Sequence, residues 1–325
     1  EGRRRDDVRS HRPVRAQMTA KIAWLAVLAA AALALAGPAN AAPPPREAQL
    51  SVVAFNVLAP VWAAPDWYPA EMDMSLLDTE FRRERITRFL AGQAPTTDVF
   101  CLQEVQESEL PYFLAALGPA FRGFMAQNEP DWWSNWLVPQ IPWAPNGTAV
   151  MVNRKSLSVA SFTDLAISGD GNHAALFDGV HQATGRRVRV ASIHLDSDFE
   201  SNRLREARSL MKQLPAVPGS TDVVCGDVNE DAVTGAVSNV FEPAGFVDVL
   251  ASVGNREPTH PWSSSYNTAP RWAIIDHIVV RNGRPLSGDV FDFGVWSIDD
   301  EVARIEANFH NTGSDHFPIG GASGL

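Results

Sequence analysis

The chain has 325 residues, of which 45% are hydrophobic and 20% are charged, and its formal net charge is −11. This composition is typical of a globular protein and excludes a disordered or fibrous chain. The length permits one large α/β domain or two smaller ones, and the acidic balance argues against broad, non-specific binding to polyanions.

The first element along the chain is an apolar run over residues 22–37, which follows Lys21 and precedes a small-x-small sequence at 39–41. A run of 16 residues is short for a membrane-spanning helix and is typical of a secretory signal peptide. We therefore expect cleavage after Ala41 and export to the periplasm or the extracellular medium. The alternative is that the run is kept as an uncleaved membrane anchor.

The domain organisation follows from this run. No linker, repeat or low-complexity stretch interrupts the rest of the chain, so one domain is the simplest expectation. The expected segments are an upstream extension without function (1–17), a signal peptide (18–41), a proline-rich lead-in (42–47) and the domain itself (48–325). Cleavage leaves 20 Lys and Arg against 35 Asp and Glu, a net charge of −15. This charge weakens a nucleic-acid hypothesis but does not exclude a nuclease that uses local contacts and a metal.

Short runs rich in valine, isoleucine and phenylalanine recur through the domain and predict β-strands. The predicted strands are 50–58, 98–102, 149–153, 187–195, 222–227, 273–280 and 289–296. A helix is predicted over 79–92, with Thr79 as its cap and Gly92 as its stop, and a second one follows His194 and ends before the turn at 215–220. Strands with few helices and long connections favour packed mixed sheets flanked by helices.

The two cysteines, Cys101 and Cys225, each lie in an apolar run. Two cysteines do not make a disulfide framework, so we expect buried free thiols that pack as small hydrophobic groups. A bridge between them is the alternative if their two strands are neighbours.

Polar residues stand at the ends of the predicted strands, where a hydrophobic core has no use for them. They are Asn56, Gln103 with Glu104, Asp227 with Asn229, Asp276 with His277, and Asp315 with His316. An unpaired buried carboxylate costs several kcal/mol, so these groups need partners, and a cation suits several of them at once. Carboxylate and amide oxygens with imidazole nearby and no thiolate favour Mg²⁺ or Mn²⁺ over a structural zinc ion.

The motifs that contain these residues resemble those of the endonuclease/exonuclease/phosphatase superfamily, which has the deoxyribonuclease I fold. The matching stretches, in chain order, are FNVLA, LQEV, NGTAV, SIHLDS, CGDVNED, IDHIVV and SDHFPI, between residues 50 and 320. The resemblance implies a four-layer α/β sandwich with two packed mixed β-sheets flanked by helices. It also implies a metal-dependent attack of water on a phosphoester at one end of the sandwich.

The resemblance assigns a role to each polar position. Glu104 corresponds to the principal metal ligand, and Asn56 and Asp315 complete or orient the metal and its waters. Asp227 corresponds to the residue that positions or deprotonates the attacking water, and Asn229 to a contact with that water or with the phosphate.

Two histidines complete the implied site. His316, paired with Asp276, and His194 correspond to the groups that stabilise the phosphorane oxygens and assist proton transfer. One position departs from the deoxyribonuclease I pattern, because Gly147 stands where an acid would face His194. In this the chain is more similar to the deadenylase and sphingomyelinase branches, which implies a phosphate contact for Asn146.

Other polar residues have simpler interpretations. Four histidines lie in polar or turn-like stretches and are expected on the surface or in loops: His173, His181, His260 and His310. His277 is expected to point to the face of its strand opposite Asp276. The solvated face of the first helix is expected to carry Arg82, Arg83 and Arg85.

Large aromatic residues crowd two irregular segments. One holds Trp62, Trp67 and Tyr68, and the other holds Trp132, Trp133, Trp136 and Trp143. Both segments are expected on the catalytic side, where the rings would pack in the core, stack on bases or insert into a lipid interface.

The sequence therefore predicts an exported, monomeric, Mg²⁺- or Mn²⁺-dependent phosphoesterase with a phosphodiester substrate and no obligate protein partner. Nucleic acid is the leading substrate class. The alternatives are a sphingomyelinase-like lipid phosphodiesterase and an inositol-phosphate-type phosphatase. A catalytically silent binding module is a third reading, but such a module would be expected to lose one of the catalytic residues, and none is lost.

Overall fold

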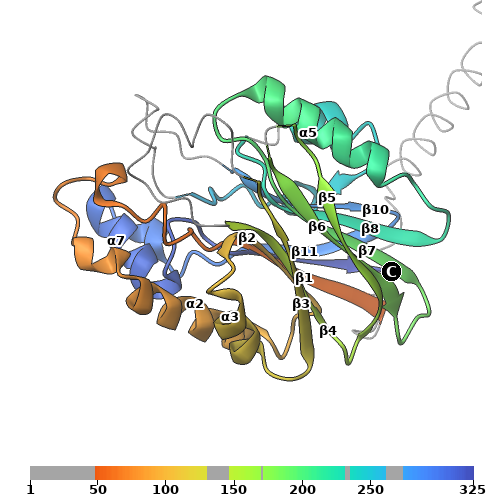
Figure 1. Cartoon of the computed structure of the whole chain (residues 1–325), viewed down its shortest axis with the longest axis horizontal. Helices are drawn as coiled ribbons and strands as arrows, with labels where there is room; N and C mark the ends of the chain where they lie inside the picture. Colours follow the sequence, from red (N-terminus) through yellow and green to blue (C-terminus); the bar gives the residue numbers. More distant parts are fainter. Residues whose placement is uncertain (1–47, 130–145, 170, 231–234, 261–273) are drawn as a thin grey trace, which may run out of the picture. The chain divides into compact units, whose positions relative to one another are not determined.

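Two six-stranded mixed sheets pack face to face, with helices on their outer faces (Figure 1). The computed structural model describes residues 48–129, 146–169, 171–230, 235–260 and 274–325. The segments expected at 1–17, 18–41 and 42–47 lie outside the described residues. The arrangement is the four-layer α/β sandwich that the sequence predicts.

The first sheet has the strand order β11-β12-β1-β2-β4-β3. Its strands are β1 (Gln49–Asn56), β2 (Val99–Gln106), β3 (Phe121–Gln127), β4 (Asn146–Asn153), β11 (Arg284–Val290) and β12 (Ile319–Gly324). The neighbours β1 and β2 are parallel, and the other pairs are antiparallel.

The second sheet has the strand order β5-β6-β7-β8-β10-β9. Its strands are β5 (Leu157–Ala166), β6 (His173–His181), β7 (Arg187–His194), β8 (Ser220–Asp227), β9 (Val247–Asp248) and β10 (Asp276–Arg281). Here β7 and β8 form the parallel pair. Each sheet therefore has one pair of parallel strands whose carboxyl ends lie side by side.

The described residues form five α-helices, and three of these make the two outer layers. The five helices are α2 (Thr79–Gln93), α3 (Leu110–Leu117), α5 (Glu200–Gln213), α6 (Val249–Ser252) and α7 (Glu301–Thr312), with short 3₁₀ turns at Pro65–Trp67, Met74–Leu77 and Val295–Ser297 and a π turn at Val237–Phe241. Apolar residues of α2 and α3 pack on the first sheet, and those of α5 pack on the second. Among the described residues, no helix has the length and apolarity needed to cross a membrane.

Strand β1 shows how the sequence creates these layers. Val52 and Ala54 point between the two sheets, whereas Val53 and Phe55 point outward, toward α2 and α3. Both faces of the strand are thus buried, which is why its sequence is apolar without alternation.

Several sequence predictions needed correction at element level. The strand predicted over 289–296 contributes only its first two residues to β11, and the chain then turns. The first helix is capped by Asp78, whose side chain accepts hydrogen bonds from the amides of Glu80 and Phe81, and it continues past Gly92. The predictions missed β3, β5, β6, β9, β12, α3, α6 and α7.

The expectation of free thiols is wrong, because Cys101 and Cys225 form a disulfide. Cys101 lies on β2 and Cys225 on β8, so the two strands belong to different sheets. Both side chains point into the apolar layer between the sheets, where their Cα atoms are 6.2 Å apart. The strands are neighbours across the sandwich and not along a sheet, a relation that the sequence pattern does not reveal.

Replacing both cysteines with alanine is expected to lower the free energy of unfolding, since the bond spans 124 residues and a loop of that size corresponds to roughly 4–5 kcal/mol in the chain-entropy model. Urea denaturation with and without dithiothreitol measures the effect. Reduction should destabilise the wild-type protein and leave the double variant unchanged. An unchanged wild-type midpoint in dithiothreitol would contradict the prediction.

His277 occupies the outer face of β10 and is 2% exposed, as expected for a side chain opposite Asp276. Its Nδ1 is 2.7 Å from Oδ2 of Asp248, and its Nε2 lies 3.0 and 3.1 Å from the carbonyl oxygens of Glu230 and Ile274. Both ring nitrogens face acceptors, so both donate and the ring is a cation. Burial alone lowers the pKa of His277, but the hydrogen bond and charge of Asp248 raise it above its ordinary value.

This raised pKa predicts a pH-dependent stability. The stabilisation is complete below the unfolded-state pKa and is lost as the pH rises through the higher folded-state pKa. We expect the difference in unfolding free energy between wild type and His277→Gln to shrink as the pH rises above the ordinary histidine pKa of about 6.5. Urea titrations at several pH values measure this difference, and a constant difference would show that folding does not raise the pKa of His277.

Candidate active site

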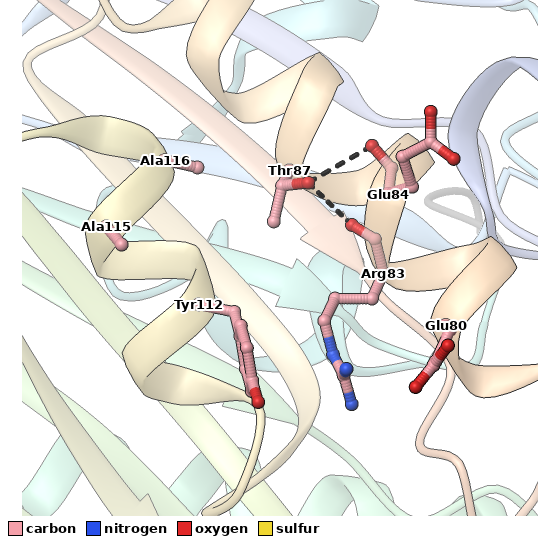
Figure 2. A pocket seen from close by; sticks show the side chains of 7 residues that line it. All are labelled: Glu80, Arg83, Glu84, Thr87, Tyr112, Ala115 and Ala116. Atoms are coloured by element: carbon pink, nitrogen blue, oxygen red, sulfur yellow. Dashed lines mark hydrogen bonds between the residues drawn. The ribbon is translucent and has the colours of Figure 1, made fainter.

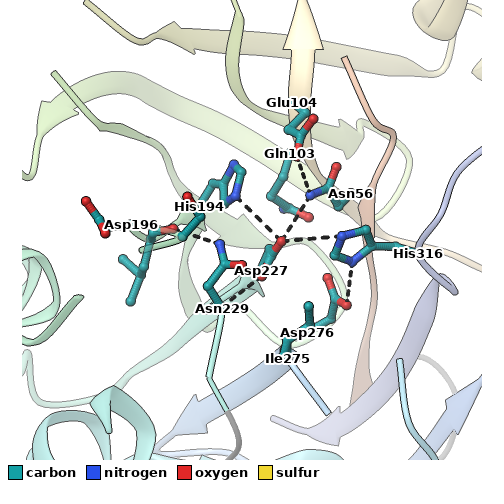
Figure 3. A network of polar contacts seen from close by, with 12 residues as sticks. Asn56, Gln103, Glu104, His194, Asp196, Asp227, Asn229, Ile275, Asp276 and His316 are labelled. Carbon is teal, nitrogen blue, oxygen red and sulfur yellow. Dashed lines mark hydrogen bonds and ion pairs between the residues drawn. The ribbon is translucent and has the colours of Figure 1, made fainter. Parts of the chain in front are cut away.

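The predicted site residues gather at one end of the sandwich because the strand registers align there. On the neighbouring strands β1 and β2, Asn56 is paired with Gln103, so the next residue, Glu104, lies beside Asn56. In the second sheet, Asp227 pairs with His194 on one side and with Asp276 on the other. Figure 3 shows these side chains converging on the carboxylate of Asp227.

Asn56 connects the two sheets. It is completely buried, and its Nδ2 donates to Oε1 of Glu104 at 2.9 Å and to Oδ2 of Asp227 at 3.0 Å. Its Oδ1 accepts a hydrogen bond from the amide of Leu58, which fixes the orientation of the side-chain amide. One neutral side chain therefore holds two carboxylates from different sheets.

Glu104 stands at an irregularity of β2, between Leu102 and Val105. Its φ is +57°, a left-handed conformation that is strained for a residue with a side chain. A strand irregularity of this kind redirects a side chain out of the regular alternation. Here it directs the carboxylate to the end of the sandwich, where Oε2 also accepts a hydrogen bond from the amide of Ala59.

Asp227 is the centre of the network. Its Oδ1 accepts a hydrogen bond from the amide of Asn229, and its Oδ2 accepts one from Asn56. The Nε2 atoms of His194 and His316 lie 3.5 and 3.6 Å from Oδ2, farther than an ordinary hydrogen bond. Asn229 has a φ of +55° and donates through Nδ2 to the carbonyl of Leu195, so this turn is held from both sides.

His316 is oriented by Asp276. Its Nδ1 is 2.9 Å from Oδ2 of Asp276, and both side chains are almost fully buried. Burial by itself lowers the pKa of His316, but the charge and hydrogen bond of Asp276, with the charges of Asp227 and Asp315, raise it well above its ordinary value. Nδ1 of the ring is thus bound to Asp276, and Nε2 is directed toward Asp227.

Asp315 is held by a second group of residues. The hydroxyl of Tyr68 donates to its Oδ2 at 3.0 Å, and Nε2 of His260 lies 4.0 Å from the same oxygen. Burial raises the pKa of Asp315, but the interaction with His260, the charges of His316 and His260 and the Tyr68 hydroxyl together hold it well below its usual range. Tyr68 itself has a raised pKa, mainly because it is buried and lies beside this carboxylate.

His260 lies in the connection between α6 and β10, a loop position as predicted, but it is not a surface residue. Its ring packs edge to face against His316 at 4.8 Å between ring centroids, and it is 13% exposed. The residue before it, Thr259, accepts hydrogen bonds from the amides of Ile275 and Asp276. In the sequence, the only sign that His260 belongs to the site is that it and Thr259 precede the strand that carries Asp276.

The other three histidines differ in environment. His310 is exposed on α7, as predicted. His173 is partly buried, and its Nδ1 lies 2.5 Å from Oδ1 of Asp164. His181 is only 3% exposed and contacts the hydroxyl of Thr184, so its predicted surface position is wrong.

Asn146 is not part of this network in the described residues. It begins β4, is buried, and its side chain lies 3.5 Å from that of Asn128. The neighbouring Gly147 has no room for a side chain, because a Cβ atom there would lie 2.0 Å from the carbonyl oxygen of Ala126. An acid at this position would require a backbone shift, and the described residues give His194 one carboxylate contact, with Asp227.

Two further groups complete the comparison with the sequence. Arg82 is buried, which contradicts its predicted place on the solvated helix face. Trp62 is 36% exposed, Trp67 is partly buried and Tyr68 is buried against α7. The second aromatic segment lies outside the described residues: Trp132, Trp133, Trp136 and Trp143.

The donor set fits a hard divalent cation. The residues predicted to hold a metal supply two carboxylates and an amide, from Glu104, Asp315 and Asn56, and both cysteines are in the disulfide. Ligand atoms of His260, Asp315 and His316 lie within 4.8 Å of one another, as do those of Asp227, Asp276 and His316. The oxygen ligands of Glu104, Asp315 and Asn56 suit Mg²⁺ or Mn²⁺, whereas the group with two imidazoles is suited to transition metals rather than to Mg²⁺.

A separate hollow of about 500 Å³ lies between α2 and α3 (Figure 2). It is lined by Glu80, Arg83, Glu84, Thr87, Tyr112, Ala115 and Ala116. None of these residues belongs to the network around Asp227, so the hollow is distinct from the candidate active site.

Comparison with known structures supports the fold. The chain is similar to ANGEL2, a 2′,3′-cyclic phosphatase, in complex with adenosine-2′,3′-vanadate (TM-score 0.64, 17% identity, 85% of this chain and 95% of that one). It is also similar to D. rerio TDP2 complexed with a single-strand DNA product (TM-score 0.60, 17% identity, 85% of this chain and 99% of that one). A third similar structure is a mannosyl-6-phosphatase of Bacteroides thetaiotaomicron (TM-score 0.56, 16% identity, 84% of this chain and 98% of that one).

A search of curated protein sequences finds no match. A family model, in contrast, covers most of the chain. The model described as the Endonuclease/Exonuclease/phosphatase family matches residues 53–316, which include every predicted site residue. The chain therefore belongs to the endonuclease/exonuclease/phosphatase family of phosphoric ester hydrolases.

Proposed function

We propose that this protein is an exported phosphoesterase that hydrolyses phosphodiester bonds with the help of Mg²⁺ or Mn²⁺, and that nucleic acid is its substrate class. The observation that carries the proposal is the position of Asp227. One of its oxygens is anchored to the Asn229 amide, and the other lies among the Asn56 amide and two imidazole nitrogens. A carboxylate held in this way is suited to orient a water molecule and accept its proton.

The two imidazoles flank this oxygen and provide the remaining groups for in-line hydrolysis. His316 is oriented by Asp276, which also raises the pKa of the ring, so its Nε2 can donate to a phosphoryl oxygen as negative charge develops there. His194 is 20% exposed and offers a second nitrogen on the opposite side of Asp227. Its exposure allows exchange of protons with solvent.

Glu104, Asn56 and Asp315 would hold the metal. When bound, a divalent cation neutralises charge on the phosphate and lowers the energy of the transition state. The protein groups position the two reacting partners relative to one another, because Asn56 fixes Glu104 and Asp227 in one arrangement.

The proposed substrate class rests on aromatic residues beside the site and on similar proteins. Trp62 and Phe199 are 36% and 55% exposed, and they follow the site strands β1 and β7 within a few residues. Exposed rings stack on bases at the edges of nucleic-acid sites. The structures of similar proteins with a single-strand DNA product and an adenosine-2′,3′-vanadate favour the same class.

A substrate panel tests this proposal. After treatment with EDTA, hydrolysis should return when Mg²⁺ or Mn²⁺ is added, and oligonucleotides and bis-nitrophenyl phosphate should be cleaved faster than nitrophenyl phosphate. Glu104→Gln should nearly abolish hydrolysis, because it removes one ligand charge with little change in volume. Initial rates with equal amounts of folded protein measure both effects.

The other outcomes of the panel have defined meanings. Faster cleavage of sphingomyelin or inositol phosphates than of oligonucleotides would overturn the nucleic-acid proposal. Full activity of Glu104→Gln, or of the wild type in EDTA, would overturn the metal dependence.

A double-mutant cycle tests the pairing of Asp276 with His316. Asp276→Asn should lower turnover by on the order of 10²-fold, because the imidazole loses its orienting carboxylate. His316→Ala should cost at least as much, and the double variant should be little worse than His316→Ala alone. Additive losses in kcat would show that the two residues do not act as a unit.

A further inference from the structure

A buried arginine lies beneath the candidate metal ligands. Arg82, on the first turn of α2, is 2% exposed, whereas Arg88 on the same helix has a side chain that is 64% exposed. The Nε of Arg82 donates to the carbonyl of Gly313 at 2.9 Å, and its Nη2 donates to the carbonyls of Val57, at 2.7 Å, and Leu58. A guanidinium group buried in this way satisfies backbone groups that belong to two different turns.

These turns carry the candidate ligands. Val57 and Leu58 directly follow Asn56, and Gly313 precedes Asp315 by two residues. Leu58 has a φ of +53°, so its carbonyl faces Arg82, and the amide of the next residue, Ala59, donates to Glu104.

The environment of Glu104 links it to Arg82 as well. Both side chains line one small cavity of about 10 Å³. The guanidinium group of Arg82 is thus connected to each of the three candidate ligands, Asn56, Glu104 and Asp315, through at most two intervening residues.

The turn at Gly313 is packed directly against the helix. Gly313 has a φ of +80°, and a Cβ atom at this position would lie 2.5 Å from the carbonyl oxygen of Arg82. The amide of Gly313 also bonds to the carbonyl of Phe309 at the end of α7. Glycine is therefore required by both conformation and space, and the turn that leads to Asp315 has little freedom to move relative to Arg82.

We propose that Arg82 is a positioning residue that sets the divalent-cation affinity of the active site, by holding the Val57–Leu58 turn and the Gly313 turn in the arrangement that brings Asn56, Glu104 and Asp315 together. The inference rests on the metal ligands of the proposed function. It assigns Arg82 no contact with substrate or metal.

The chemistry of the side chain explains why an arginine is needed. A guanidinium presents several donors in a rigid plane, whereas the ammonium group of lysine is a point charge on a flexible chain. Charge and geometry also have opposite effects here. A positive charge near a cation site opposes cation binding, so removal of the charge alone would tighten binding, and loss of the geometry would weaken it.

The neighbouring arginine has different partners. The side chain of Arg83 is 23% exposed, faces the hollow between α2 and α3 beside Tyr112 (Figure 2), and pairs with Glu109. Arg83 also lines the small cavity beside Glu104, but no hydrogen bond joins it to the turns that Arg82 holds in the described residues.

The test measures Mn²⁺ binding by titration calorimetry and the melting temperature of the apo protein for Arg82→Lys, Arg82→Gln and Gly313→Ala. The control is Arg88→Gln, which makes the same charge change on the exposed face of α2. Both Arg82 variants are expected to raise the Kd for Mn²⁺ by roughly tenfold or more, as changes behind metal ligands do. Gly313→Ala should also raise it, and Arg88→Gln should not.

Two other outcomes decide against the proposal. If Arg82→Lys binds Mn²⁺ as well as wild type while Arg82→Gln binds it more tightly, the residue acts through charge and not through position. If folded Arg82 variants melt at lower temperature but keep the wild-type Kd, the role is only structural. If Arg82→Gln does not fold, Arg82→Lys and Gly313→Ala make the same comparison.

A reference variant separates this inference from the proposed function. Wild-type Mn²⁺ binding that is lost in Glu104→Gln supports the ligand assignment, whatever the Arg82 variants do. If the wild type shows no Mn²⁺ binding that depends on Glu104, the metal assignment fails, and the inference fails with it.

Discussion

The candidate active site depends on two pairs of parallel strands that run to the same edge of the sandwich. In the first sheet β1 ends with Asn56 and β2 carries Glu104 two residues before its end, and in the second sheet β7 and β8 end with His194 and Asp227. Parallel neighbours place their carboxyl ends together, and the apolar layer between the sheets fixes the separation of the two pairs. The candidate catalytic groups are therefore positioned by the cores of the strands and not by loop contacts alone.

At that edge several acids lie close to one another, which costs free energy unless donors compensate. The compensation is divided among different groups. Asn56 donates to Glu104 and Asp227, Tyr68 donates to Asp315, and His316 donates to Asp276. Each donor also fixes the direction in which its carboxylate points, so electrostatic compensation and geometry are supplied by the same bonds.

Much of the fold and of the candidate site could be predicted from the sequence, because the apolar runs of the strands and the polar residues at their ends are strong signals. Strands buried on both faces, such as β1 and β8, are continuous apolar runs, and polar residues at their ends stand out against that background. The half-exposed strand β5 and the glycine-rich strand β12 lack such runs and were missed.

His260, Arg82 and the cysteine pair were misjudged for another reason. Their environments are created by segments far away in sequence, and a polar residue in a helix or a turn carries no local sign that a distant turn will cover it.

Apart from the backbone itself, the bond between Cys101 and Cys225 is the only covalent link between the two sheets in the described residues. Such a bond persists in oxidising compartments and not in a reducing cytosol. In a reducing compartment the two sheets would therefore be held together by packing and by the backbone connections alone. In an oxidising compartment the bond adds resistance to unfolding and proteolysis, so the redox state of its surroundings determines how durable the enzyme is.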